Sequence, residues 1–296
     1  MRGQNVALLT RNKKKREYEF VSKFYFSEEE VNWADIVGAI ICTPTSHHLE
    51  TLNKLVRRGI PTLVEKPISS NMVGVLELED YVQKNNSQVM VGFNFRYHPH
   101  IKIIKEIIQN NKLGKIYYAN FTWSDSIEKW YGSEYKNNYT SSKSLGGGAL
   151  RTMCHELDLA LWFFGEFESC KSSLKNLSSL KMNGVEDFFC GEINFRNGVF
   201  TRMQLDFITD IPNRNIFISS ERGSVKWDYY RGKLHVRVNG QSRLIDDKEI
   251  TIEYKNKMYI ELIDDFIEMC NKNTHSKIPF KDGVNVQKII NKLSND

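Results

Sequence analysis

The first third of the chain alternates short apolar runs with stretches whose apolar positions recur at helical spacing. Apolar runs of this length predict buried strands, and the stretches 46–59 and 70–85 predict amphipathic helices. Strands that alternate with helices across short turns are typical of a parallel sheet covered on both faces. We therefore predict a doubly wound α/β domain. Its predicted strands are residues 5–10, 23–26, 37–43, 61–66 and 88–94.

After about residue 115, long runs appear in which apolar and polar residues alternate. This period of two predicts strands with one buried face, which favours a large, mainly antiparallel open sheet. Helical spacing returns over 149–164 and 259–273, which we expect to lie against this sheet, and over 283–293. The predicted strands are residues 115–125, 188–195, 198–207, 215–220, 223–230 and 233–238.

These patterns predict an α/β fold of two domains. We expect a Rossmann-like cofactor domain over residues 1–98, and an α+β domain for substrate binding and oligomerisation over 99–278. The last segment, 279–296, is predicted to be a helix that packs back on the Rossmann domain.

Composition narrows the class of protein. The chain has 296 residues, 41% hydrophobic and 26% charged, and its apolar runs are too short to cross a bilayer, so we expect no membrane partner. Five widely spaced cysteines show no metal or redox spacing, and the N-terminus lacks a signal-peptide pattern, which favours a cytoplasmic protein without a metal. The basic run 11–16 reads as a solvated loop, so we expect no nucleic-acid partner.

Polar side chains follow three of the predicted strands at the point where each strand ends. Because the carboxyl ends of parallel strands meet at one edge of a sheet, these side chains are predicted to gather where such sheets bind ligands. For Lys66 alone, a snorkelling lysine at a strand end explains the position equally well. The residues at the three strand ends are Thr43, Pro44 and His48, then Glu65 and Lys66, then Asn94 and Arg96.

The stretch "GGGALRTMCHELDLALWFFG" at 146–165 opens with three glycines before a predicted helix. No strand leads directly into it and no Lys-Ser/Thr follows it, so a phosphate-binding P-loop is excluded. On the predicted helix, Thr152, His155 and Asp158 are spaced three apart and share one face, which Trp162 completes. The spacing alone fits either a structural or a chemically active histidine.

The motifs together resemble one family. "CTPxxxH" at 42–48, "EKP" at 65–67, "GFNxR" at 92–96 and the stretch at 146–165 look like the Gfo/Idh/MocA oxidoreductases, and the resemblance extends to "FKDGVNVQKII" near the C-terminus. It implies hydride transfer between NAD or NADP and a secondary alcohol or ketone of a sugar, sugar nucleotide or cyclitol. It also implies an N-terminal Rossmann domain and homo-oligomers formed through the C-terminal sheet.

The resemblance also implies roles for single residues. Lys66 would hydrogen-bond the reacting oxygen and stabilise its negative charge, and His155 would act as general base, with Thr152 beside them. The substrate would contact Lys66, Arg96, Thr152, His155 and Asp158. The cofactor would contact Thr10, Arg11, Thr43, Pro44, His48, Glu65, Lys66 and Asn94.

The chain departs from the family pattern in two places. Thr152 stands where the family usually has an aspartate, and a hydroxyl cannot hold a negative charge beside His155. The family's first strand and G-x-G-x-x-G turn have no counterpart before residue 5, so we expect an incomplete Rossmann domain. Arg11, after the first predicted strand, favours a 2′-phosphate and hence NADP. The alternative is a non-catalytic, truncated member that acts as an oligomerising scaffold.

Overall fold

The structure, a computed structural model, describes residues 5–10, 18, 20–246, 252–272 and 274–294. The chain divides into two compact units, Met1–Val37 and Gly38–Asp296. In the first unit, β1 (Val6–Leu9) and β2 (Val21–Tyr25) form a two-stranded parallel sheet. The short 3-10 helices η1 (Glu28–Glu30) and η2 (Trp33–Asp35) follow it. The domain boundaries expected at residues 98 and 278 stay predictions.

The second unit begins with a three-stranded parallel sheet in the order β3 (Ala39–Ile41), β4 (Thr62–Val64) and β5 (Val89–Val91). The 3-10 helix η3 (Thr45–His47) and α1 (His48–Arg57) connect β3 to β4, and α2 (Val75–Lys84) connects β4 to β5. All residues of β4 and β5 are buried, which explains their continuous apolar sequence.

The helix α2 begins later than the predicted start at residue 70. Asn71 accepts a hydrogen bond from the Val73 amide through its side chain, and Gly74 adopts a left-handed backbone with a φ of 75°. A side chain that bonds the local backbone competes with helix formation, so the chain turns before the helix starts.

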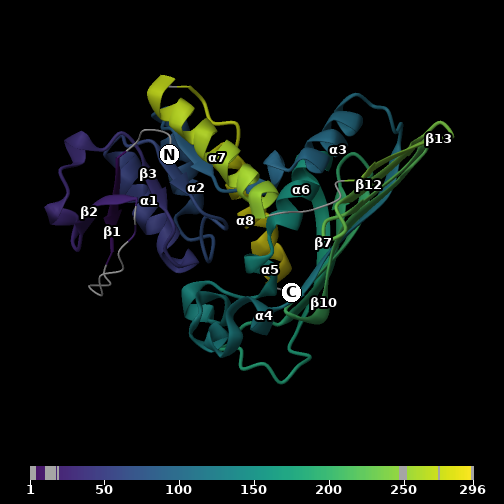
Figure 1. Ribbon diagram of the computed structural model, residues 1–296, viewed down its shortest axis with the longest axis horizontal. Helices are drawn as coiled ribbons and strands as arrows, with labels where there is room; N and C mark the ends of the chain where they lie inside the picture. Colours follow the sequence, from purple (N-terminus) through teal and green to yellow (C-terminus); the bar gives the residue numbers. More distant parts are fainter. Residues whose placement is uncertain (1–4, 11–17, 19, 247–251, 273, 295–296) are drawn as a thin grey trace. The chain divides into compact units, whose positions relative to one another are not determined.

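The large sheet has eight strands in the order β13-β12-β11-β10-β6-β9-β8-β7. All neighbouring pairs are antiparallel except β6 and β9, which confirms the predicted mainly antiparallel sheet. Figure 1 shows this sheet with α5 and α6 on one of its faces. Its strands are β6 (Ile116–Ser126), β7 (Phe167–Lys175), β8 (Phe188–Phe195), β9 (Phe200–Asp206), β10 (Ile208–Ser220), β11 (Gly223–Asp228), β12 (Lys233–Val238) and β13 (Gln241–Asp246).

The two outermost strands, β7 and β13, are absent from the sequence prediction. Both lie at the edges of the sheet, and β7 has no fully buried residue. An edge strand with little buried surface needs few apolar residues, so the alternating pattern that reveals the inner strands is weak there.

The predicted helix over 149–164 is two helices, α5 (Ala149–Thr152) and α6 (His155–Phe164), separated by a turn at Met153 and Cys154. Eight of the ten residues of α6 are buried. A helix that is apolar on nearly all sides is expected to be buried on nearly all sides. The charged residues Glu156 and Asp158 of α6 therefore need partners inside the protein.

The contacts of α7 (Ile252–Lys272) correct the expectation that it lies against the large sheet. Phe266 and Cys270 approach Gly38 just before β3, and the side-chain amide of Gln88, just before β5, donates to the Met269 carbonyl. The helix α8 (Phe280–Ser294) contacts α2 and β5 as well as α6 and β7.

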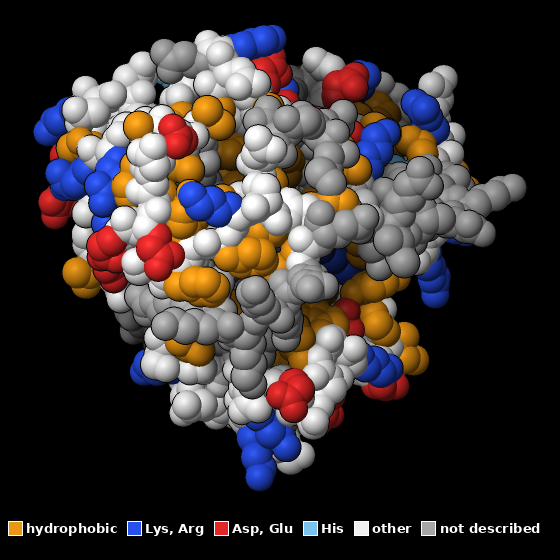
Figure 2. Space-filling view, turned by 60° about the vertical axis from the view of Figure 1, so that its left-hand side comes forward, with side chains coloured by type: hydrophobic (Ala, Val, Ile, Leu, Met, Phe, Trp, Pro, Cys, Tyr) orange, Lys and Arg blue, Asp and Glu red, His pale blue; other side chains and the backbone are white. Residues whose placement is uncertain are grey.

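The remaining described elements are helices between β5 and β7. Among the described residues, no helix is long and apolar enough to cross a membrane. On the face shown in Figure 2, hydrophobic side chains form several separate groups between acidic and basic ones. The remaining helices are η4 (Asn94–Tyr97), α3 (Pro99–Gln109), α4 (Ile127–Tyr131), η5 (Gly132–Asn137), η6 (Tyr139–Ser141) and η7 (Lys143–Leu145).

Candidate active site

Lys66 lies in the loop after β4 and reaches across to α5. Its ammonium donates a hydrogen bond to the backbone carbonyl of Thr152 at a distance of 2.6 Å. Thr152 is the last residue of α5, and carbonyls at a helix C-terminus lack intrahelical partners, so the ammonium supplies one. The contact brings together two of the predicted site residues from segments 86 residues apart in the chain.

His155 and Thr152 lie on either side of the turn between α5 and α6 instead of sharing one helical stripe. Both side chains are buried. Among the described residues, neither the Thr152 hydroxyl oxygen nor the Nδ1 atom of His155 has a hydrogen-bond partner. Buried polar atoms are nearly always paired, so these two atoms are candidates for a hydrogen bond with a ligand or an ordered water.

The imidazole of His155 is surrounded by aromatic rings. Ring centroids lie 5.1 Å away for Phe95, 6.2 Å for Trp123 and 6.3 Å for Phe93. Burial lowers the pKa of His155 well below its ordinary value of 6.5, and the positive charges of Lys66 and Arg214 lower it further. The imidazole is therefore neutral at neutral pH and has a lone pair with which to accept a proton.

His48, a predicted cofactor contact, is fully engaged with the protein backbone. One ring nitrogen lies 2.7 Å from the Pro67 carbonyl, and the other lies 2.7 Å from the Thr43 carbonyl. Both ring nitrogens face protein carbonyls, and the contact of His48 with a cofactor stays a prediction. His48 thereby ties the loop after β3 to the loop after β4.

Glu65 and Asn94 line the ends of neighbouring strands. A side chain at Gly92, just after β5, would place its Cβ only 3.1 Å from a carboxylate oxygen of Glu65, so the carboxylate lies directly against that backbone. Asn94 is 2% exposed, and its side-chain oxygen has no partner within the described part of the chain. The strand-end position of both residues agrees with the predicted edge, while their cofactor contacts stay predictions.

Arg96 and Asp158, both predicted to bind substrate, are paired with each other. The Nε and Nη2 atoms of Arg96 donate to the two carboxylate oxygens of Asp158 at 3.0 and 2.5 Å, and Nη1 donates to Asp282 of α8 at 2.6 Å. Burial raises the pKa of Asp158 to about 6, while Arg96 favours its charged form. This pairing joins η4, α6 and α8, and the substrate contacts of both residues stay predictions.

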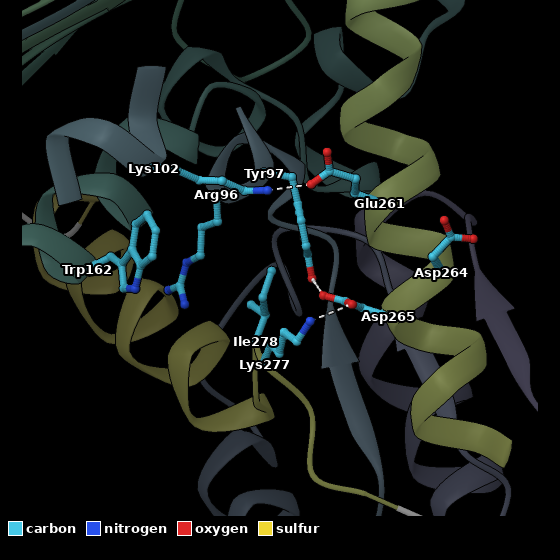
Figure 3. A pocket seen from close by; sticks show the side chains of 9 residues that line it. All are labelled: Arg96, Tyr97, Lys102, Trp162, Glu261, Asp264, Asp265, Lys277 and Ile278. Carbon is cyan, nitrogen blue, oxygen red and sulfur yellow. Dashed lines mark hydrogen bonds and ion pairs between the residues drawn. The ribbon is translucent and has the colours of Figure 1, made fainter. Parts of the chain in front are cut away.

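Arg96 also lines a cavity of about 320 Å³, shown in Figure 3. The Tyr97 hydroxyl and the Lys277 ammonium donate to the two carboxylate oxygens of Asp265 at 2.7 and 2.6 Å, and Lys102 pairs with Glu261. Lys66, Thr152 and His155 are not among its lining residues. Since Lys102, Lys277 and Arg96 are each paired with a carboxylate, we do not place the chemistry there.

Two of the predicted cofactor contacts, Thr10 and Arg11, belong to the first unit. The Thr10 amide donates to the Tyr25 carbonyl at 3.0 Å, next to the β1–β2 sheet. Arg11, on which the preference for NADP rests, lies outside the described residues.

Sequence reasoning missed a buried pair close to His155, formed by Arg214 of β10 and Glu156 of α6. The one sequence signal for this pair is the position of Glu156, an acidic residue directly after His155 in a predicted apolar helix.

Comparison with known proteins gives two family matches. Residues 105–294 match the oxidoreductase family's C-terminal alpha/beta domain of the Gfo/Idh/MocA type, and residues 2–93 match the same family's NAD-binding Rossmann fold. NAD or a close analogue is therefore the cofactor class of this fold, as the sequence predicted. The non-catalytic scaffold gains no support from the relatives, which are described as oxidoreductases and dehydrogenases.

Two curated relatives and one solved structure show the extent of the similarity. Oxidoreductase P35 of Formosa agariphila is 27% identical over 248 residues, which is 79% of this chain and 74% of that protein. Inositol 2-dehydrogenase of Rhizobium meliloti is 30% identical over 134 residues, covering 45% of this chain but only 38% of the relative. A levoglucosan dehydrogenase in complex with NADH and levoglucosan superposes with a TM-score of 0.83 at 21% identity, over 93% of this chain and 81% of that one. The chain belongs to the Gfo/Idh/MocA family of oxidoreductases.

Proposed function

We propose that the chain transfers a hydride between NAD or NADP and a secondary alcohol or ketone of a sugar, sugar nucleotide or cyclitol. The observation that supports this most is the Lys66 ammonium held at the Thr152 carbonyl, beside two buried and unpartnered polar atoms. The relatives named for inositol and levoglucosan act on polyhydroxylated rings, which fits the substrate class.

The nicotinamide supplies or accepts the hydride when it is bound, and the chain's residues handle the oxygen and its proton. An ammonium has three N–H donors, of which one binds the Thr152 carbonyl and fixes the direction of the others. A second donor of Lys66 would bind the reacting oxygen and stabilise its developing negative charge. The neutral ring of His155 would accept the hydroxyl proton.

Thr152 would orient the substrate through its hydroxyl, whose oxygen is otherwise unpartnered in the described structure. Thr43, Pro44, Glu65 and Asn94 would border the cofactor along the edge of the parallel sheet. The residues present fit such a group, because the buried side-chain oxygen of Asn94 lies at this edge with no partner among the described residues.

We also propose that a second copy of the chain covers the outer face of the large sheet. Strand register places Tyr118 beside Phe200, and the Tyr118 and Phe217 rings lie 5.9 Å apart. These rings face away from the buried residues Ala119 and Phe121 of the same strand. Analytical ultracentrifugation tests this, with Phe217→Lys expected to yield monomers; a wild-type monomer at micromolar concentration would contradict it.

The test of the proposed activity is a substrate screen. The purified chain is mixed with NAD or NADP and with myo-inositol, levoglucosan or glucose 6-phosphate, and formation of the reduced cofactor is followed by absorbance. Turnover with at least one polyol, lost in Lys66→Met, would support the proposal. Lys272→Met is the matched control, because its exposed ammonium pairs with Glu268 on the surface of α7. Absence of both turnover and cofactor binding would refute it.

A further inference from the structure

A buried arginine shares its surroundings with His155. Arg214 of β10 is 2% exposed, and its guanidinium carbon lies 3.5 Å from the Phe95 ring centroid and 3.9 Å from that of Trp123. The same two rings flank the imidazole of His155. A displacement of the guanidinium would therefore move both aromatic rings, Phe95 and Trp123, that pack against the imidazole.

Glu156 anchors this arginine. The Nε atom of Arg214 donates to a carboxylate oxygen of Glu156 at 2.6 Å, and both side chains are buried. Glu156 follows His155 directly in the first turn of α6. The pair therefore fastens the start of α6, and with it the backbone of His155, to β10 in the large sheet.

The charges around His155 come from several elements. Lys66 approaches from the loop after β4, Arg214 from β10, and Glu156 from α6 itself. Two further titratable groups are neutral at neutral pH, since burial lowers the pKa of His98 to about 3 and raises that of Cys154 to about 12. Among the described residues, Lys66 and Arg214 are therefore the two cations whose charges lower the pKa of His155, and Glu156 anchors Arg214.

We propose that Arg214, anchored by Glu156, is a positioning residue for His155: it holds the aromatic walls of the imidazole in place and sets a fixed positive charge beside it. The proposal rests on the proposed function, in which His155 handles the proton. Within the described part of the chain, Arg214 forms no hydrogen bond with Lys66 or Thr152, so its effect passes through His155.

The first measurement does not need activity. In protein with isotope-labelled histidine rings, the His155 signal is identified by its loss in His155→Gln, and its pKa is followed by NMR. Removing the arginine charge in the double variant Glu156→Gln with Arg214→Met should raise the pKa of His155 toward the ordinary value of about 6.5. The double variant is used because removal of one partner alone leaves a buried unpaired charge.

The second measurement is kinetic. In the double variant, kcat should fall by about a hundredfold, since small misplacement of a catalytic group has effects on that order. The dissociation constant for NADH should stay unchanged, because neither residue lies at the edge of the parallel sheet. Arg214→Lys keeps the charge but cannot fill the space between two rings as a planar group, so its kcat should lie between those of the wild type and the double variant.

Arg202→Met is the matched control, because Arg202 is an exposed arginine of the same large sheet and pairs with Glu192 at the surface. It should leave both measurements unchanged. A folded double variant with the wild-type kcat and the wild-type His155 titration would overturn the proposal, and so would a wild-type kcat in Arg214→Lys. If the wild-type chain turns over no polyol, the proposed function fails, while the NMR titration still decides the role of Arg214.

Discussion

Two groups of polar side chains, most of them buried, meet on α6, and they differ in how completely their atoms are paired. In the group of Arg96, Asp158 and Asp282, three guanidinium nitrogens donate to carboxylate oxygens. In the group of Lys66, Thr152 and His155, one hydrogen bond joins the ammonium to a backbone carbonyl, while a hydroxyl and a ring nitrogen stay without partners in the described structure.

The difference distinguishes polar groups that bind one another within the fold from polar groups that are available to a ligand. A buried ion pair with satisfied hydrogen bonds balances its own desolvation. A buried polar atom without a partner costs about 1–3 kcal/mol, which the rest of the fold must offset. Such a cost is understandable where a ligand completes the hydrogen bonds. We therefore propose that substrate binds at His155 and Thr152 and that Arg96 and Asp158 hold the elements together.

The largest expected effect is on stability, in the paired group. Arg96→Met leaves two carboxylates without their partner and should lower the free energy of unfolding by about 3–5 kcal/mol. Urea denaturation measures the loss. Arg196→Met is the control, since its partner Glu166 is exposed and surface pairs contribute less than about 1 kcal/mol. A variant of Arg96 with normal stability but weakened substrate binding would reverse our assignment.

The next effect is on catalysis, in the unpaired group. Lys66→Met should reduce kcat by a hundredfold or more, because loss of one donor to a developing negative charge costs about 3 kcal/mol. Affinity for NADH, measured by fluorescence titration, should change little. A turnover number equal to that of the wild type would remove Lys66 from the mechanism.

The third effect concerns acid stability. The pKa of His155 is lowered in the folded state, so below pH 6.5 the unfolded chain binds a proton that the folded chain does not. Stability should therefore fall as pH drops below this value, by about 1.4 kcal/mol per pH unit for each such histidine. His155→Gln should remove one proton from this slope, measured by denaturation at several pH values. His275→Gln, at an exposed position, is the control and should leave the slope as it is.

The smallest effect is expected at Thr152. Thr152→Val removes a hydroxyl oxygen that has no partner in the described structure while keeping the shape of the side chain. The free energy of unfolding should change by less than about 1 kcal/mol or rise slightly, because no hydrogen bond is lost. The KM for the polyol should rise in steady-state kinetics. Equal kinetics in the variant would show that the hydroxyl does not contact substrate.

Sequence pattern predicted the parallel strands and the inner strands of the large sheet, because buried strands carry continuous or alternating apolar runs. It also predicted that Lys66, Thr152 and His155 belong to one site, since motifs mark all three. It did not predict the break between α5 and α6, because the apolar pattern continues through Met153 and Cys154.

The roles of the paired residues depend on contacts that local sequence does not contain. Arg96 and Asp282 are 186 residues apart, and Arg214 and Glu156 are 58 apart. A polar residue at a strand end looks the same whether it faces a ligand or a distant carboxylate. The sequence therefore predicted where polar groups gather. It left open which of these groups find a hydrogen-bond partner within the protein.

The most direct test compares both groups in one NMR experiment. NADH and levoglucosan form a complex that cannot react, since a reduced cofactor cannot oxidise an alcohol; myo-inositol with NADH serves equally. The histidine ring signal of His155 and the guanidinium Nε–H signal of Arg96 are followed as the two compounds are added together. The account predicts that the His155 signal shifts and the Arg96 signal stays in place. A shift of the Arg96 signal with an unchanged His155 signal would contradict it.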